Sequence, residues 1–372
     1  MKRLASPLPF GSLTTDVRSD LGLTVGQRPR EVAILVGLVL LLGLVFLLSL
    51  VLGSTSVPLR RVVEALIGIS RERDAAVIVV ETIRLPRSLT AMLAGASLGI
   101  AGLQMQTLFR NPLADPFALG ISSGASLGVA LVVLGTGYGA AAAFGAAMGV
   151  RGDALITAAA IVGAALVLGL VLLVSTRIPN PTTVLILGLM FGYAVSAMVT
   201  VLVGASQPER LQQWAQWGFG SFSGVTWQRL RLFAPLTCVG VLIASTTTKQ
   251  LNALLLGENY ARSMGVAVRR ARLLTMFGAS VLGAVVTAFC GPISFLGIAV
   301  PHLCRGLLGT SDHRVLVPAV VLMGSAVALV AQIVSLLPGS AGVLPLNAVT
   351  SLMGAPVVVA VLLRSRRGAF AG

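Results

Sequence analysis

The sequence predicts an all-α integral membrane protein with about ten transmembrane helices and both termini in the cytoplasm. Its 372 residues are 56% hydrophobic and only 10% charged, whereas a soluble domain is about 45–50% apolar and about 25% charged. The apolar residues form runs of about 20, the length that crosses roughly 30 Å of hydrocarbon. Glycine reaches 42 residues, and small residues let membrane helices pack closely. The composition therefore excludes a soluble globular chain and a disordered one.

Ten apolar segments follow one another after a polar start. They cover residues 32–52, 89–109, 117–135, 154–175, 183–204, 232–248, 273–290, 292–308, 315–337 and 346–363. We expect residues 1–31 to form a retained N-terminal arm, since no small-residue cleavage site follows the first apolar run. Residues 32–364 would then form one membrane domain, and residues 365–372 a cytoplasmic tail. The Gly- and Ala-rich stretch 136–149 is a loop or a helix extension.

The basic residues favour one orientation of this domain. If the arm is cytoplasmic, 17 of the 27 Lys and Arg residues fall on the cytoplasmic side, as the positive-inside rule requires. The 53–88 loop is an exception to this rule, because it places six arginines outside. In a soluble protein the formal charge of +15 would suggest nucleic acid as a partner. Here we attribute it to topology and expect no nucleic acid.

Several kinds of chemistry lack the residues that they need. No Asp or Glu lies in the middle of a predicted span, although ion-coupled carriers and pumps usually bury ionisable groups there. The chain has no GxxxxGK[ST] phosphate loop, so it cannot hydrolyse ATP by that device. Cys238, Cys290 and Cys304 have no CxxC spacing, which supports neither a metal site nor a disulfide framework. If transport is active, its energy must come from another subunit.

The basic cytoplasmic loop 249–272 is the candidate contact for such a subunit. Glu258, Ala261 and Arg262 are spaced i, i+3 and i+4, which places them on one face of a short helix. The small Ala261 would leave space on that face for the groove of a partner. An ordinary solvated loop helix explains the same pattern.

The turn from Arg110 to Pro116 is a second cytoplasmic feature. Pro112 and Pro116 interrupt helical continuity. Non-helical backbone near membrane depth persists only where it is buried in protein or lines a cavity, so this turn can border a pathway. A tight interhelical turn capped by Asn111 and Asp115 explains the pattern equally well.

The sequence also contains an internal echo. Residues 95–97 and 119–121 read Gly-Ala-Ser and Leu-Gly-Ile, and residues 278–280 and 296–298 repeat both triplets. Repeated halves are common in transporters, but glycine-rich helices also match by chance. A repeat of the two halves and a coincidence are both open.

Seven ordered stretches together resemble one known family. They read RLPRSLTAMLAGASLGIAG (84–102), QTLFRNPLADPFALGISSGAS (106–126), WAQWGFGSFSGVTW (214–227), LGENYARSMGV (256–266), GPISFLGIAVPHLCR (291–305), SDHRVLVPA (311–319) and LPLNAVTSLMGAPVVVAVLLR (344–364). In type and order they are similar to the FecCD-type permease subunits of bacterial ABC importers for iron-siderophores, haem and cobalamin. The resemblance runs over most of the chain.

The resemblance implies ten helices and cytoplasmic termini in a prokaryotic inner or plasma membrane. It implies a homodimer, or a heterodimer with a sister permease, around one translocation path. Two ATPase subunits would bind below, and a periplasmic or lipid-anchored substrate-binding protein above. ATP and Mg would be bound by the ATPase subunits. This chain would then carry no catalytic residue, metal or cofactor of its own.

Ten residues of the chain match functional positions of the family. They are Gly257, Glu258, Ala261 and Gly265 for coupling to the ATPase, Arg84 and Arg87 for docking of the binding protein, and Asn111, Leu113, Thr182 and Thr183 for a gate at the cytoplasmic mouth. The two arginines would pair with carboxylates of the binding protein, and rim charges of this kind mainly steer association. They would also account for part of the external arginines.

An iron(III)-chelate is the expected cargo, because it is the commonest in the family. Cobalamin and haem remain alternatives, and an ion-coupled secondary carrier is a remote one. A chelated metal needs no protein ligand, so we expect His302 to bond to the backbone. Val343 and Asn347 depart from the acidic and glycine positions of the family's last motif, at the external mouth.

Overall fold

A computed structural model of the chain describes residues 27–53, 56–68, 74–135, 152–178, 180–336 and 343–369. Every regular element within them is helical. The helices are α2 (Gln27–Val51), α3 (Leu59–Ile67), α4 (Ala75–Val79), α5 (Leu85–Phe109), α6 (Ile121–Ala130), α8 (Asp153–Ser175), α9 (Pro181–Gly204), α10 (Pro208–Gly218), α11 (Trp227–Thr246), α12 (Thr248–Leu255), α13 (Glu258–Ser263), α14 (Val268–Cys290), α15 (Leu296–Leu308), α16 (His313–Ser335) and α17 (Leu346–Ala369). Most of the predicted arm, the stretch 136–149 and the last three residues lie outside the described residues.

Seven of the described helices are long and apolar enough to cross a membrane. They are Pro29–Val51, Ala75–Phe109, Asp153–Ser175, Pro181–Gly204, Trp227–Thr246, Val268–Cys290 and His313–Ser335. Three shorter apolar helices are Ile121–Gly135, Leu296–Leu308 and Leu346–Ala360. Each of the ten predicted apolar segments therefore coincides with a helix, and the all-α membrane class is confirmed.

The prediction of a loop over 53–88 is wrong. Helix α3 lies in it, and residues 75–109 form one continuous helical rod in which the π-helical turn Val80–Arg84 joins α4 to α5. Glu81, Arg84 and Arg87 interrupt the apolar pattern there, so hydropathy alone started this span too late. The six arginines of the region therefore do not all lie on an open external loop.

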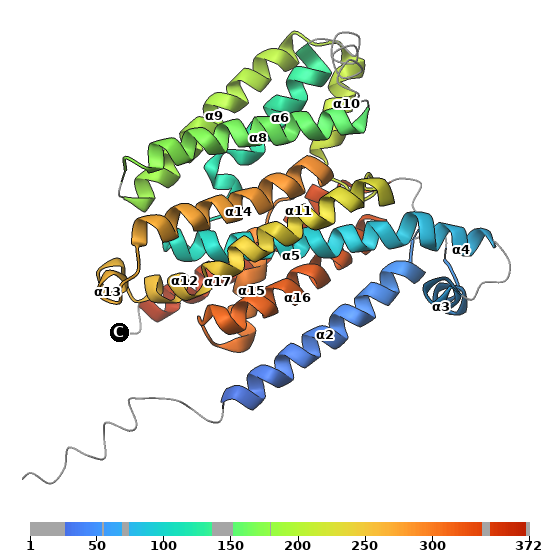
Figure 1. Cartoon of the computed structure of the whole chain (residues 1–372). Coiled ribbons are helices and arrows are strands. Elements are labelled where there is room, and N and C mark those ends of the chain that lie inside the picture. Colours follow the sequence, from blue (N-terminus) through green and yellow to red (C-terminus); the bar gives the residue numbers. More distant parts are fainter. Residues whose placement is uncertain are drawn as a thin grey trace, which may run out of the picture.

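Helix α5 forms the centre of the bundle (Figure 1), with α11 and α14 on one side and α15 and α16 on the other. Glycine makes this arrangement possible. A Cβ on Gly102 would lie 1.7 Å from the carbonyl oxygen of Gly297 in α15, and one on Gly95 would lie 2.1 Å from that of Gly324 in α16. The backbones touch at both crossings, which is the packing that small residues allow in membranes.

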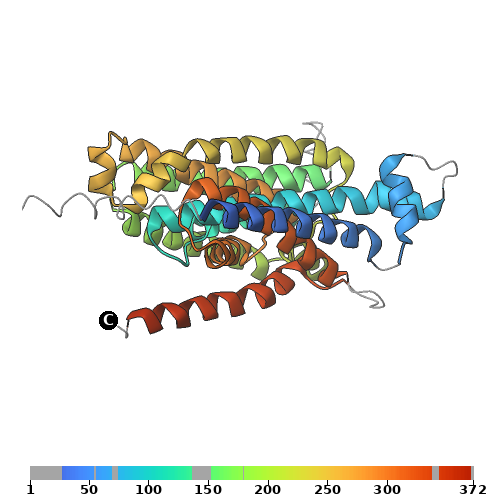
Figure 2. The same ribbon diagram turned by 90° about the horizontal axis from the view of Figure 1, so that it is seen from below.

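The two ends of the bundle carry different elements. Helices α12 and α13 lie at one end, and α3 and α4 lie at the other (Figure 1). The first residues of α2 and the last of α17 point to the α13 end (Figures 1 and 2). Figure 2 also shows α17 running along one side of the bundle, where it contacts α15 and α16. Helix α17 continues to Ala369 and so takes in part of the predicted tail.

Candidate functional site

The residues predicted for coupling lie on a short helix at one end of the bundle. Helix α13 follows Gly257, whose φ of 118° is one that residues with a Cβ rarely adopt. Gly265, with a φ of 82°, follows its last turn. The predicted short helix is confirmed, and the two glycines let the chain turn sharply out of α12 and back into α14.

Ala261 does not lie on an exposed contact face, contrary to the prediction. Its side chain is fully buried in a small cluster with Leu251, Leu254 and Val268. The small side chain therefore allows α13 to pack on α12 and α14 of its own chain. A spacing rule places residues on one face but cannot say which face turns inward.

Glu258 joins α13 to the start of α14. Its Oε1 accepts a hydrogen bond from Nη2 of Arg272 at 2.6 Å, and its Oε2 accepts one from Nη2 of Arg262 at 3.2 Å. Arg272 is buried and Arg262 is exposed. A charged pair with one buried partner holds its geometry more firmly than two solvated side chains do. Helix α13 is thus clamped to a membrane-spanning helix.

An apolar knob covers the outer surface of this element. We define it as Leu256, Tyr260 and Met264, which are 66%, 52% and 55% exposed. Leu256 precedes α13, Tyr260 lies within it and Met264 follows its last residue. Large exposed apolar patches are typical of surfaces that contact proteins or membranes.

The predicted gate turn, from Arg110 to Pro116, is attached to α12, the helix that precedes α13. Arg110 adopts a left-handed φ of 47°, and its Nη2 donates a hydrogen bond to the carbonyl oxygen of Leu254 in α12 at 3.1 Å. Oδ1 of Asn111 accepts a hydrogen bond from the N–H of Leu113 at 2.9 Å, and Oδ1 of Asp115 accepts one from Phe117. The turn is therefore capped by Asn111 and Asp115, and it is tied to α12.

A buried polar network that the sequence did not suggest lies behind this turn. Oγ1 of Thr107 is 2.9 Å from Nε2 of His313, and Nδ1 of His313 is 2.7 Å from Oδ1 of Asn252. Nε2 of Gln104 donates to Oγ1 of Thr247 at 2.9 Å. These bonds connect α5, α12 and α16. The polar residues within these otherwise apolar spans could have indicated such a network, since buried polar groups need hydrogen-bond partners.

The second pair of predicted gate residues lies elsewhere. Thr182 and Thr183 are exposed in the first turn of α9, where Oδ1 of Asn180 caps the N–H of Thr182 at 2.9 Å. Within the described residues, no hydrogen bond or ion pair joins them to the Asn111 turn. Further along α9, Gly188 and Gly192 allow close approach of Leu119 and Gly120. We therefore assign those glycines to helix packing.

Arg84 is not exposed as its predicted docking role requires. It is only 5% exposed, and its Nη1 donates hydrogen bonds to the carbonyl oxygens of Leu50 and Val51, both at 2.8 Å. Those carbonyls end α2, where intrahelical donors are missing. Gly53 leaves room, since a Cβ there would lie 3.1 Å from Nη2 of Arg84. Arg84 therefore caps a helix.

Arg87 has a different position. It lines a cavity of about 370 Å³ at the end opposite α13, together with Gln216, Gln332 and Val343. Its Nε is buried and has no hydrogen-bond partner in the described part of the chain. Oδ1 of Asn347, beside this cavity, accepts a hydrogen bond from the N–H of Ser294 at 3.0 Å. Of the two predicted docking arginines, Arg87 is the one that faces a cavity.

We expect the two arginines to respond differently to replacement. Arg84→Gln should destabilise the protein by about 2 kcal/mol, because hydrogen bonds from charged donors contribute about 1.5–3 kcal/mol and the end of α2 would lose its cap. Arg87→Gln should leave the melting temperature nearly unchanged. Thermal unfolding in detergent measures both. Equal losses would contradict the distinction between a capping and a cavity-facing arginine.

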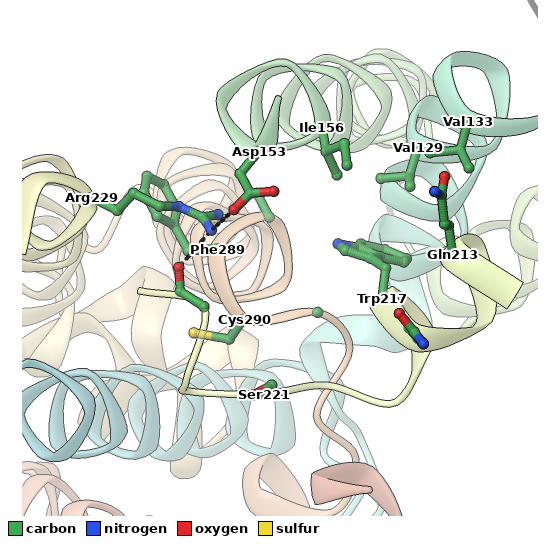
Figure 3. Close-up of a pocket in the computed structure, with 14 residues that line it drawn as sticks. Val129, Val133, Asp153, Ile156, Gln213, Trp217, Ser221, Arg229, Phe289 and Cys290 are labelled. Atoms are coloured by element: carbon green, nitrogen blue, oxygen red, sulfur yellow. Dashed lines mark hydrogen bonds and ion pairs between the residues drawn. The ribbon is translucent and has the colours of Figure 1, made fainter. Parts of the chain in front are cut away.

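Another cavity at the same end, of about 430 Å³, lies between α6, α8, α10, α11 and α14 (Figure 3). Arg229 crosses one side of it. Its Nη1 lies 3.6 Å from Oδ2 of Asp153, its Nη2 donates to Oγ1 of Thr157, and its guanidinium lies 5.7 Å from the ring centre of Phe289. Figure 3 shows Trp217 on the opposite side. Arg229 thus has its partners within the chain.

His302 lies with its Nδ1 2.8 Å from the carbonyl oxygen of Ile298, as predicted for a histidine bonded to the backbone. Among the described residues no group of three or more His, Cys, Asp or Glu side chains could hold a metal ion.

These features define a helical membrane protein whose polar elements gather at the two ends of its bundle. The model of the FecCD transport family matches residues 40–364, and the chain belongs to that family. It is accordingly a permease of the ABC importer type, a transport component of a bacterial inner membrane and not an enzyme. The predicted family is confirmed.

The chain is similar to several permeases named for vitamin B12 import. It is 37% identical to BtuC of Klebsiella pneumoniae over 285 residues, which is 76% of this chain and 82% of that protein. It is 35% identical to BtuC of Citrobacter koseri over 286 residues, which is 77% and 83% of the two chains. A solved structure described as an inward-facing metal-chelate type ABC transporter matches with a TM-score of 0.76 and 29% identity, covering 89% of this chain and 99% of that one.

Proposed function

We propose that the chain is the membrane subunit of a binding-protein-dependent importer, and that ATP hydrolysed on partner subunits moves a metal chelate through it. The observation that carries this proposal is the connection of the apolar knob to the bundle. Glu258 ties α13 to α14, and Arg110 ties the Asn111 turn to α12. A displacement of the knob would therefore be passed to a membrane-spanning helix and to the gate turn together.

We further propose ten spans with both termini on the side of α13. The seven long helices and the three shorter apolar ones support this count. The ends of α2 and α17 at the α13 end support the orientation (Figures 1 and 2). A homodimer would enclose the path, as in the family resemblance, and ATP and Mg would be bound by the two ATPase subunits.

The proposal also assigns residues to a gate at the inner mouth and to a docking site for the binding protein. Asn111 and Leu113 would narrow the inner mouth, and Thr182 and Thr183 would move toward them from a second layer. Arg87 would receive a carboxylate of the binding protein at the outer end, while Arg84 keeps the end of α2 in place. Arg60 and Arg61 are already paired with Glu64.

The docking role of Arg87 predicts a change in the affinity of the binding protein. Arg87→Glu should weaken binding about tenfold at low salt and reduce its salt dependence, because a steering charge has been reversed. Titration of the binding protein onto the permease in nanodiscs measures this. Lys249→Glu, an exposed charge reversal at the α13 end, serves as the control. Unchanged affinity of the Arg87 variant at low salt would contradict the docking role.

The apolar knob predicts a loss of ATPase binding. Tyr260→Ser should weaken the complex with the ATPase about tenfold, since an aromatic anchor at an interface contributes on the order of 1–2 kcal/mol or more. Leu59→Ser replaces a similarly exposed apolar residue of α3 at the other end of the bundle. It should not change ATPase binding. Co-purification at graded concentrations measures both variants. An ATPase that binds the Tyr260 variant normally would rule the knob out.

For the cargo, we propose an iron(III)-siderophore, with cobalamin as the second candidate. The similarity to a metal-chelate type transporter supports a chelate, and the similarity to BtuC proteins favours cobalamin. Haem is the third cargo that the family resemblance implies. Uptake of radiolabelled ferric siderophores, cobalamin and haem by a deletion strain with and without the gene separates them. Restored uptake of cobalamin alone would contradict the iron proposal.

A further inference from the structure

A basic cavity of about 740 Å³ lies at the α13 end, between the last turn of α8 and the start of α14. Its lining residues are Ser175, Thr176, Arg177, Ile178, Arg262, Val266, Ala267, Val268, Arg269, Arg270, Arg272 and Leu273. Five of these residues are arginines and none is acidic. The cavity is distinct from the knob and from the gate turn.

The positive charge around this cavity is only slightly compensated. Glu258 is the one carboxylate that forms ion pairs with its arginines among the described residues, and its two oxygens are taken by Arg262 and Arg272. Arg269 donates to the carbonyl oxygen of Thr176 at 3.2 Å. Arg177 and Arg270 form no ion pair within the described part of the chain. The arginines around this cavity outnumber the carboxylate that pairs with them, and such an excess of positive charge attracts an anion.

The start of α14 adds to this attraction. Arg269, Arg270 and Arg272 lie in its first five residues, no acidic residue lies in its first turn, and Ala267 gives its N-terminus no side-chain cap. The N-terminus of a helix carries a partial positive charge, so acidic residues usually stabilise it and basic ones do not. The local sequence therefore opposes helix stability here, and it leaves the partial positive charge of the helix N-terminus beside the arginines.

The length of the two helices places the cavity at the depth of lipid headgroups if both cross the membrane. Helices α8 and α14 each have 23 residues, or roughly 34 Å at 1.5 Å per residue, close to the thickness of the hydrocarbon core. The end of α8 and the start of α14 therefore meet the interface on one side of the membrane. Guanidinium groups at this level can bind the two oxygens of a phosphate together.

Apolar side chains continue from the arginines along both helices. On α14, Leu274 and Phe277 follow Arg270 at i+4 and i+7, and both are exposed. On α8, Leu173 lies four residues before Arg177 and is also exposed. On α14 these spacings place the three residues on one helix face, and Arg177 lies two residues beyond the end of α8. Each face thus begins with a cation and continues into the hydrocarbon with apolar side chains.

We propose that this cavity binds the phosphate headgroup of an anionic phospholipid, with the acyl chains along the exposed faces of α8 and α14. Basic pockets between spans at the membrane surface suit such headgroups. A free phosphate would meet the same guanidinium groups but not the apolar faces. The membrane is therefore favoured over a soluble anion.

Native mass spectrometry of the full-length permease in detergent tests the proposal, with phosphatidylglycerol and phosphatidylcholine as the lipids. Arg177→Gln with Arg270→Gln should weaken phosphatidylglycerol binding about tenfold or more, since two basic residues would no longer attract the anionic headgroup. Phosphatidylcholine binding should not change. Arg231→Gln with Arg314→Gln removes two exposed charges outside the cavity and should keep wild-type binding.

Further variants and competitors distinguish a bound lipid from a soluble anion or a protein contact. The conservative pair Arg177→Lys with Arg270→Lys should retain most of the preference, which gives a readout if the Gln pair folds poorly. Equal binding of the two lipids by the wild-type protein, or an unchanged preference in the Gln pair, would overturn the proposal. Displacement of phosphatidylglycerol by millimolar inorganic phosphate would indicate a soluble anion instead. Loss of the lipid on addition of the ATPase subunit would indicate a protein contact instead.

Discussion

Glu258→Arg is expected to abolish ATP-driven uptake while the membrane bundle stays folded. The substitution places a third guanidinium beside Arg262 and Arg272 and removes the carboxylate that holds both. Breaking a pair with one buried partner costs about 3–5 kcal/mol, so α13 should detach from α14. Uptake in proteoliposomes with ATPase and binding protein should fall at least about a hundredfold, because a detached α13 could no longer pass a movement of the ATPase to α14.

The fold of this variant is checked separately. Size-exclusion chromatography in detergent should show an intact permease, because the spans of α5 and α14 do not depend on α13. Glu209→Arg, the same reversal on an exposed residue of α10, should still co-purify with the ATPase. If uptake and co-purification of the Glu258 variant both stayed normal, the coupling role of α13 would be wrong.

Gly102→Ala is expected to prevent assembly of the bundle. The added Cβ would lie 1.7 Å from the carbonyl oxygen of Gly297 and 2.7 Å from its Cα. No side chain can move away there, since both contacts are backbone. Helices α5 and α15 must separate, which opens the most buried part of the structure. Overpacking of a tight interior costs about 1–3 kcal/mol or more, and a clash with backbone lies at the upper end.

The matched control is Gly169→Ala in α8, another spanning helix. A Cβ at Gly169 meets nothing within 4 Å, and alanine has the better helix propensity. Its yield and melting temperature should equal those of the wild type or exceed them, while the Gly102 variant should be poorly recovered. Equal melting temperatures for Gly102→Ala and the wild type would contradict the close packing of α5 on α15.

Hydropathy predicted the membrane spans well because it reports directly on the solvent around a helix. It failed at Arg84 for a physical reason. A buried arginine is satisfied there by the carbonyl oxygens of Leu50 and Val51, which lie more than thirty residues earlier. No local pattern can reveal such a partner. The residue therefore resembled an external loop charge, and the start of the span was missed.

The candidate site was predicted in part. The glycines that bound α13 could be read from the sequence, because a sharp turn demands a residue without a Cβ. The inward orientation of Ala261 could not, since it depends on how α12 and α14 pack. The bonds among Thr107, His313 and Asn252 also join three separate segments. The internal echo also cannot be judged from sequence alone, because equivalent glycines have different neighbours. Gly95 packs against Gly324, whereas its counterpart Gly278 packs against Ile243.

The account rests on the claim that the chain transports only when an ATPase drives it through α13. Proteoliposomes that contain the permease and the loaded binding protein measure this directly, with and without the ATPase subunit and Mg-ATP. We predict uptake only when both are present, and none when a proton or sodium gradient replaces them. Uptake by the permease alone down such a gradient would contradict the account.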